Sequence, residues 1–333
     1  MDLFYLSAGS SRWGTGHLLR SIELIDVLKK NGLHVSTVAL VPDKTEMQQM
    51  SAFIKIYDRH VYSLSEIGTV NADGIVVDVH TDFQPEVLPW LKKQGLNVVA
   101  VDWYYDNGGV ITARANLRGG PQALKYALIR KEFHDALRNR SCQGPKYDAV
   151  VVMGGGDRRE YLYKIFQFFS EEPRFLKKNI VIVLGPMVKG KITELAGSSF
   201  GAISIARNPA DIADIMAGAA VGITNGGTSL MEFTMLGIPT IIFTQTEEED
   251  NFIQPFLESG CSVSGANEHG EFARQITELL ENEILRKIRA EKARKLIDGH
   301  GAKRITDLIF KTFLQKESNI RGGYNESQDY KKN

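Results

Sequence analysis

A strand, a glycine-rich turn and the start of a helix occur twice in this sequence, once near the beginning of each half. In the first copy the apolar run 3–6 leads into a Gly/Ser-rich turn over 9–17, and a helical pattern of apolar residues follows. In the second copy the run 149–153 leads into the glycines of 154–157, and a helix is expected from Arg158. Glycine lets backbone approach a ligand closely, and the N–H groups of a helix start favour an anionic or polar group. The repetition predicts two similar α/β domains that face each other, although a tight turn without a ligand would give the same local pattern.

Both halves continue as an alternation of short strands and helices. The expected strands are rich in β-branched residues and lie at 34–40, 74–79, 97–102, 179–184, 202–205, 220–224 and 239–243. Such alternation implies parallel sheets with right-handed crossover connections, so the predicted fold class is α/β.

The length of the chain and one turn-rich segment set the predicted domain borders. A chain of 333 residues favours two domains, because one domain usually has ~100–200 residues. The turn chemistry of residues 141–146 places the border there. We therefore expect a first domain over 1–143, a second over 144–315 and a polar, disordered tail over 316–333. The last helix of the second domain could instead pack back on the first domain.

Composition narrows the class of partner. The 40 basic and 40 acidic residues cancel without a basic block, so neither a nucleic-acid surface nor strong attraction to anionic lipid is expected. Cys142 and Cys261 lack metal-ligand spacing and fit a reducing, cytoplasmic compartment. No segment approaches the ~18 apolar residues of a membrane span, so secretion and membrane insertion are not expected. We expect a small-molecule partner, no metal, no cofactor, and a monomer or weak oligomer.

Two strands of the first half end in an acidic residue. Asp102 closes the run 97–102, and Asp78 lies one residue before the end of the run 74–79. His80 follows the run 74–79 directly. Ligands of open α/β sheets bind beyond the carboxyl ends of the strands, so these side chains are expected to face one crevice together with His17. The alternatives are a helix cap or turn role for either aspartate, a capping or packing role for His17, and a surface position for His80.

The turn after run 220–224 is the most informative stretch of the second half. Gly226 and Gly227 make the turn, Thr228 or Ser229 can cap the helix that follows, and the exposed N–H groups would suit a diphosphate. Glu232, one helical turn further, can accept hydrogen bonds from two ribose hydroxyls. Its alternative role is structural, because an acid in the first turn of a helix is favourable against the helix dipole.

Several of these motifs resemble a known family. Residues 14–20, Gly-Thr-Gly-His-Leu-Leu-Arg, are similar to the Gly-x-Gly-His-x-x-Arg opening of the UDP-sugar hydrolase of the pseudaminic acid pathway and of related spore-coat polysaccharide proteins. Further matches lie at 128–133, 154–157, 226–233, 236–239 and 301–305, so the resemblance covers most of residues 2–313 at low density. It implies the GT-B architecture, two Rossmann-like domains with parallel sheets facing across a cleft, which the GlcNAc transferase of bacterial cell-wall synthesis shares.

The resemblance implies a division of labour between the domains. The second domain holds the uridine nucleotide, with the diphosphate on the turn 226–229 and the ribose on Glu232, while His17 deprotonates the water that attacks the anomeric carbon. The residues expected on the sugar side are Gly14, Gly16, Arg20, Asp78, His80 and Asp102, and those on the nucleotide side are Gly155, Gly156, Asn225, Gly226, Gly227, Thr228, Ser229, Glu232 and Asn251. An imidazole is a competent general base near neutral pH, and UDP can leave without a metal if amides and hydroxyls take its charge.

The chain departs from the family pattern at two places. Asp102-Trp103 stands where those hydrolases tend to carry paired aspartates, and Asp250-Asn251-Phe252 stands where they carry Asp-Asn-Gln. Both departures lie near the expected cleft, so the sugar, or the reaction, could differ. The acidic run 247–251 itself is expected to be a solvated loop.

Three functions follow as hypotheses. The preferred one is an inverting nucleotide-sugar hydrolase in surface polysaccharide or nonulosonic acid biosynthesis. The second is a glycosyltransferase of the same fold, in which an acceptor hydroxyl replaces water, with the basic segment 117–140 as the candidate patch for a lipid-linked acceptor. The third is a non-enzymatic subunit that binds a nucleotide sugar and recruits a partner.

Overall fold

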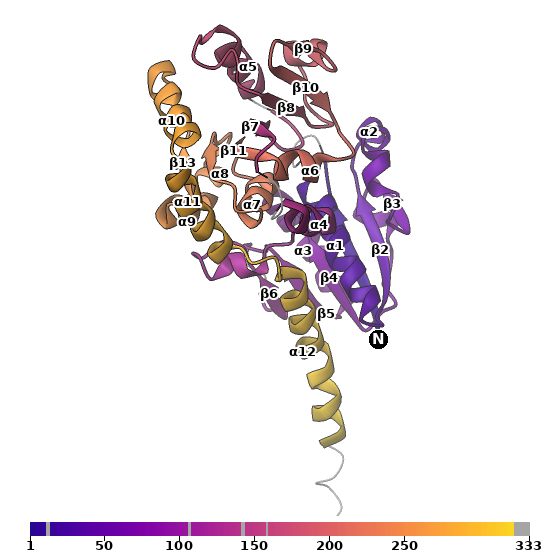
Figure 1. Cartoon of the computed structure of the whole chain (residues 1–333). Coiled ribbons are helices and arrows are strands. Elements are labelled where there is room, and N and C mark those ends of the chain that lie inside the picture. Colours follow the sequence, from indigo (N-terminus) through magenta and orange to yellow (C-terminus); the bar gives the residue numbers. More distant parts are fainter. Residues whose placement is uncertain (11–13, 106–107, 141–143, 158, 323–333) are drawn as a thin grey trace, which may run out of the picture.

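The computed structural model describes residues 1–10, 14–105, 108–140, 144–157 and 159–322 and contains two sheets (Figure 1). The first sheet has the strand order β3-β2-β1-β4-β5-β6 and is parallel throughout. Its strands are β1 Asp2–Ala8, β2 His34–Leu40, β3 Arg59–Val61, β4 Gly74–Asp78, β5 Asn97–Val101 and β6 Ala113–Ala115. Its helices are α1 Gly16–Lys30, α2 Lys44–Ile54, α3 Gln84–Gln94 and α4 Lys131–Arg140, the last of which leads to the second sheet.

The second sheet has seven strands in the order β13-β12-β11-β7-β8-β10-β9. Its strands are β7 Tyr147–Val152, β8 Ile180–Leu184, β9 Ser199–Phe200, β10 Ile203–Arg207, β11 Ala219–Thr224, β12 Thr240–Ile242 and β13 Ser262–Ser264. The short edge strand β9 pairs antiparallel with β10, whereas the other pairs are parallel, as predicted. The helices after β7 are α5 Tyr161–Glu171, α6 Ile212–Ala217, α7 Thr228–Met235, α8 Glu247–Phe252, α9 Gln254–Ser259, α10 His269–Glu281, α11 Glu283–Leu296 and α12 Gly301–Gly322.

Each sheet is buried on both faces. Along β1, Leu3 and Tyr5 belong to one apolar cluster and Phe4 and Leu6 to another. Successive side chains of a strand point to opposite faces, so these two clusters lie on the two sides of the first sheet. Burial on both faces explains the uninterrupted apolar runs from which the strands were predicted.

The last helix returns to the first sheet. Ile305, Ile309 and Phe313 of α12 belong to the same apolar cluster as Leu3 of β1, and a Cβ at Gly74 would lie 2.5 Å from the Phe313 ring. In Figure 1, α12 runs past β5 and β6 and extends away from the second sheet. The close approach at Gly74 requires the smallest residue, so the sequence of β4 is adapted to this helix.

The C-terminal tail and the acidic run differ from the local structure that the sequence predicts. The helix α12 continues to Gly322, so the expectation of a disordered tail is wrong for residues 316–322. No glycine or proline that would interrupt a helix occurs between residues 302 and 321. Residues 323–333, the border residues 141–143 and the expected helix start at Arg158 lie outside the described residues. The acidic run expected as a loop is the helix α8, whose N-cap Thr246 accepts a hydrogen bond from the Glu249 N–H.

Candidate functional site

One cavity of about 1320 Å³ lies between the carboxyl ends of the two sheets. Loops after β1, β4 and β5 line it from the first sheet, and loops after β7, β8, β10, β11 and β12 line it from the second. The expected residues that line it are Gly14, Gly16, His17, Arg20, His80, Asp102, Gly155, Gly156, Asn225, Gly226, Gly227, Thr228, Ser229 and Glu232. Asp78 and Asn251 were expected in the site but do not line the cavity.

His17 stands in the first turn of α1 with its ring against Asp78. His17 Nδ1 lies 2.6 Å from Asp78 Oδ1, and the His17 side chain keeps 13% of its surface exposed, at the cavity. The interaction with Asp78 occupies Nδ1 and leaves Nε2 as the nitrogen available to a ligand. A histidine oriented in this way by a carboxylate is an arrangement typical of general bases.

Asp78 lies behind His17 and does not line the cavity. It is fully buried at the end of β4, where Arg20 Nε and Nη2 donate to its two oxygens at 2.9 and 2.5 Å and Ser21 Oγ donates at 3.2 Å. Burial alone would raise the pKa of Asp78, but the Arg20 guanidinium and the His17 imidazole outweigh it and lower the pKa to about 2. Asp78 is therefore ionised behind His17 and acts only as a hydrogen-bond acceptor.

Arg20 is also engaged inside the protein. The residue is 4% exposed, and besides Asp78 it pairs with Asp102, with Nη1 3.5 Å from Asp102 Oδ2. Asp102 has φ 60°, a left-handed conformation that aspartate tolerates better than most residues. Its carboxylate also accepts hydrogen bonds from the Tyr104 hydroxyl and the Leu117 N–H. Arg20 thus lines the cavity as expected, while its guanidinium is paired with Asp78 and Asp102.

His80 and residues of α8 form a contact between the two domains beside His17. The His80 and His17 rings meet edge to face, with centroids 5.9 Å apart. His80 Nδ1 accepts the Asp82 N–H at 3.2 Å, and Nε2 faces Glu248 Oε2 at 3.4 Å. Burial, followed by the neighbouring His17, lowers the pKa of His80, so its ring is neutral near pH 7.

The acidic helix α8 takes part in the site. Glu248 accepts hydrogen bonds from Thr81 and Arg118 of the first domain, and it lines the cavity. Burial opposes its charge, but these two donors lower the pKa of Glu248 overall. The prediction of a solvated run holds for Glu247, Asp250 and Asn251, which are exposed. It is wrong for Glu248, because partners distant in the chain bind this carboxylate.

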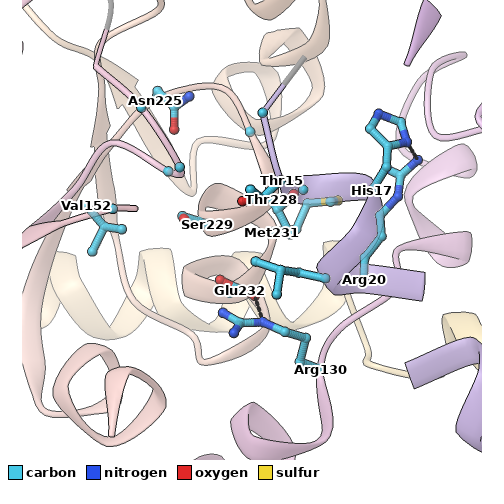
Figure 2. Close-up of a pocket in the computed structure, with 18 of the residues that line it drawn as sticks. Thr15, His17, Arg20, Arg130, Val152, Asn225, Thr228, Ser229, Met231 and Glu232 are labelled. Atoms are coloured by element: carbon cyan, nitrogen blue, oxygen red, sulfur yellow. Dashed lines mark hydrogen bonds and ion pairs between the residues drawn. The ribbon is translucent and has the colours of Figure 1, made fainter. Parts of the chain in front are cut away.

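The two helix starts α1 and α7 meet across the cavity. Thr15 is the N-cap residue of α1 and forms no side-chain cap hydrogen bond. The N-cap residue of α7 is Gly227, which has no side chain, so the expectation that Thr228 or Ser229 caps this helix is wrong. A Cβ at Gly16 would lie 2.7 Å from Thr228 Oγ1. Figure 2 shows Thr15 beside Thr228, with Ser229 close to them. The uncapped N–H groups of α7 and the hydroxyls beside them can bind an anion.

Glu232 is paired with an arginine of the first half of the chain that was not among the expected site residues. Arg130 Nε donates to Glu232 Oε1 at 2.8 Å (Figure 2), and both residues line the cavity. Burial raises the pKa of Glu232, and the charge of Arg130 opposes this rise. The motif 128–133 was noticed in the sequence, but only the fold brings Arg130 to α7.

Asn251 is exposed on α8, and Glu249 takes the place expected for it. Glu249 accepts hydrogen bonds from Asn225 Nδ2 at 2.7 Å and from the Gln245 N–H at 2.7 Å. Two residues along a helix correspond to a rotation of about 200°, so Asn251 points away from the cavity when Glu249 points into it. The nucleotide-side prediction for Asn251 is therefore not supported by its position.

Two other classes of site are not found in the described part of the chain. Its His, Cys, Asp and Glu side chains form no group of three or more that could hold a metal ion. None of its helices combines the length and the apolar surface needed to cross a bilayer.

Comparisons with known proteins extend along almost the whole chain. No family model matches the chain. The spore coat polysaccharide biosynthesis protein SpsG of Bacillus subtilis is 21% identical over 354 residues, which cover 95% of this chain and 100% of SpsG. A putative UDP-N-acetylglucosamine 2-epimerase of Listeria monocytogenes has a TM-score of 0.63 at 16% identity, covering 95% of this chain and 98% of the epimerase. UDP-GlcNAc 2-epimerase of Neisseria meningitidis, solved bound to UDP-GlcNAc, has a TM-score of 0.62 at 14% identity, covering 93% and 100%. The chain is thus distantly similar to SpsG along its length, and its two facing sheets form a GT-B fold.

Proposed function

We propose that this protein is an enzyme that hydrolyses a nucleotide sugar, most simply a UDP-linked amino or deoxy sugar, in polysaccharide or nonulosonic acid biosynthesis. The observation that carries the proposal is the His17–Asp78 pair at 2.6 Å, facing the uncapped start of α7 within one cavity. A general base and an anion site in one cavity are what displacement of a diphosphate from a sugar requires. The similarity to SpsG and the bound ligand of the Neisseria epimerase support the substrate class.

The nucleotide would bind to the second domain. Ser229 and the N–H groups at the start of α7 would hold the diphosphate, and Glu232 would accept hydrogen bonds from the ribose hydroxyls. The part of the cavity lined by Pro186, Asn208 and Ile212 remains for the base. The cavity volume of about 1320 Å³ exceeds the ~300–1,000 Å³ typical of small-molecule pockets, so a nucleotide sugar fits inside it.

His17 would act on water at the anomeric carbon. Nε2 removes a proton from the water while its oxygen bonds to the anomeric carbon, and the bond from that carbon to the β-phosphate oxygen breaks. The electron pair leaves with UDP, whose charge the α7 N–H groups receive, and the sugar departs with inverted configuration. Asp78 holds the imidazole in place and stabilises the imidazolium that forms.

The same geometry could activate an acceptor hydroxyl instead of water, which is the transferase alternative. Arg118 and Arg130 are the cavity-lining arginines of the basic segment 117–140. Both are paired with carboxylates of the second domain, Glu248 and Glu232. Their charges are therefore already balanced, which favours water over an anionic lipid-linked acceptor.

The proposal is tested by nucleotide release without an acceptor. The purified protein is incubated with UDP-, CMP- and GDP-linked amino sugars, and nucleotide release and the first anomer formed are followed by NMR. We expect release of UDP with inversion, lost in His17→Gln and kept in His34→Gln, which alters an exposed histidine at the other end of the first sheet. Release only after an acceptor is added would identify a transferase, and tight binding without turnover in either setting would refute the enzyme hypothesis.

A further inference from the structure

Two neighbouring glutamates of helix α8 bind residues on different sides of the cavity. The first, Glu248, accepts hydrogen bonds from Thr81 Oγ1 and Arg118 Nη2, and its Oε2 lies 3.4 Å from His80 Nε2. These three partners follow strands β4 and β6 of the first sheet and line the cavity. Glu248 therefore joins α8 to the loops beside His17, whose ring meets that of His80.

The second glutamate binds the turn before α7. The Glu249 carboxylate accepts hydrogen bonds from Asn225 Nδ2 at 2.7 Å and from the Gly226 N–H at 3.4 Å. The backbone of this turn also packs directly on α8, because a Cβ at Gly226 would lie 2.8 Å from Glu249 Cβ and 2.9 Å from Ile253 Cγ2. The turn and α8 therefore have to move together.

The helical backbone connects the two sets of contacts. Successive residues of a helix point about 100° apart, so Glu248 and Glu249 reach different sides while sharing one rigid backbone. That backbone is held by Thr246, which accepts the Glu249 N–H, and by the Ile253 N–H, which donates to the Glu249 carbonyl. A displacement of the turn is thus passed to the Glu248 carboxylate.

We propose that α8 couples the turn 225–227 to the loops beside His17, with Glu248 as the positioning residue that holds those loops when the turn is fixed. The inference rests on the proposed function, in which a diphosphate binds the N–H groups at the start of α7. A bound diphosphate fixes the turn and so stabilises the contacts of Glu248 without touching them. Coupling between two sites is reciprocal, so the contacts of Glu248 also strengthen nucleotide binding.

Further contacts extend the effect to the residues around the proposed base. The Arg118 guanidinium lies 4.6 Å from the centre of the Tyr104 ring. The Tyr104 hydroxyl donates a hydrogen bond to Asp102, which in turn pairs with Arg20. The sugar side of the cavity is therefore fully ordered only when the nucleotide side is occupied, and a sugar without its nucleotide is a poor ligand.

The first test is amide hydrogen exchange of the full-length chain with and without UDP, which carries no sugar. The observed amides are those of 82–83 and 117–118, which donate hydrogen bonds within the loops that Glu248 holds. In the wild type, saturating UDP should slow their exchange by about fivefold or more. Glu248→Ala and Arg118→Met should each abolish this slowing, and by reciprocity each should weaken UDP binding, measured by calorimetry, by a similar factor. The control is Glu258→Gln, at an exposed position of α9, which should keep both properties.

Both variants of the Arg118–Glu248 pair should fold. The two side chains keep 31% and 29% of their surfaces exposed, so the charge that remains after either substitution is hydrated. The pair is broken from α8 in one variant and from the first sheet in the other. A loss of coupling in both would therefore come from the contact itself and not from a local change in α8.

A second comparison needs no ligand. Gly226→Ala has to displace α8, so exchange at the same four amides should become faster by about fivefold or more. In the double variant Gly226→Ala/Glu248→Ala it should be no faster than in Glu248→Ala alone, because the contact is already lost. The control is Gly144→Ala, since a Cβ there meets nothing within 4 Å.

Two outcomes would overturn the coupling. One is exchange at these amides that Gly226→Ala leaves unchanged, and the other is a slowing by UDP that persists in both Glu248→Ala and Arg118→Met. If UDP does not bind at all, the proposed function fails, while the comparison without ligand still decides whether α8 couples the two sides. Hydrolysis of a nucleotide sugar together with either overturning outcome would refute the coupling alone.

Discussion

At the scale of single residues, the site depends on a histidine whose partners come from elsewhere in the chain. The sequence could single out His17 because it stands at a glycine-rich turn before a helix, and could place Asp78 at a strand end. It could not show that Asp78 is fully buried and bound by three side chains, because depth below a sheet edge depends on packing. The same limit applies to Arg20, whose pairs with Asp78 and Asp102 the sequence could not show.

The role of Asp78 gives a kinetic prediction. Asp78→Asn keeps the shape but removes the charge and allows the wrong imidazole tautomer, so kcat should fall by about 10²–10⁴ with a small change in KM. Steady-state kinetics of nucleotide release measure this. A kcat within a few-fold of the wild-type value would mean that Asp78 does not orient the base.

The low pKa of Asp78 gives a stability prediction. Its pKa is about 2, below the ordinary value of ~3.9, so its ionised form stabilises the folded state above about pH 4. That stabilisation, on the order of 2 kcal/mol, should be lost as the pH falls through about 2.

Thermal unfolding between pH 5 and pH 2 measures this loss. The difference in the free energy of unfolding between the wild type and Asp78→Asn should become smaller as the pH falls. The control is Asp211→Asn, at an exposed position, whose free energy of unfolding should change with pH in the same way as that of the wild type. A difference in the free energy of unfolding that does not depend on pH would contradict the stabilising role of ionised Asp78.

At the scale of elements, the turn before α7 and the helix α8 form one unit. A Cβ at Gly226 would lie 2.8 Å from Glu249 Cβ and 2.9 Å from Ile253 Cγ2, so even alanine must displace α8. The sequence predicted the turn from its glycines and the start of α7 after it, but not the helix α8, which was expected as a loop. It could not predict that α8 presents Glu249 inward and Asn251 outward, because a short acidic segment has no apolar stripe to fix its rotation.

This packing predicts the effect of one methyl group. Gly226→Ala should weaken UDP binding by about tenfold or more, because it moves the N–H groups that would face the diphosphate. Isothermal titration calorimetry measures the affinity. Gly144→Ala is the control, since a Cβ there meets nothing within 4 Å. Equal affinities for UDP in the two variants would mean that this turn does not contribute to the nucleotide site.

At the scale of the whole molecule, two ion pairs join distant parts of the chain across the site. Arg130–Glu232 lies beside α7, and Arg118–Glu248 lies beside His80. The alternation of strands and helices predicted two facing α/β sheets, which the structure confirms. It could not predict these pairs, since each joins residues more than a hundred positions apart.

The Arg130–Glu232 pair predicts that the two residues act together on nucleotide binding. Glu232→Gln should weaken UDP binding by roughly 10–100-fold, because a buried hydrogen-bonded carboxylate is lost. Arg130→Met should weaken it by about tenfold, because Glu232 then lacks its cation and tends to bind a proton. If Arg130 acts through Glu232, the double variant should bind no more weakly than Glu232→Gln. Calorimetric losses that simply add would contradict this.

The central claim is that water activated by His17 attacks the anomeric carbon, and its most direct test is a single turnover in ¹⁸O-labelled water. We expect the label in the released sugar and none in UDP, with the rate reduced by about 10²–10⁴ in His17→Gln at unchanged UDP affinity. Label in the phosphate of UDP, or a His17→Gln rate equal to that of the wild type, would contradict the account.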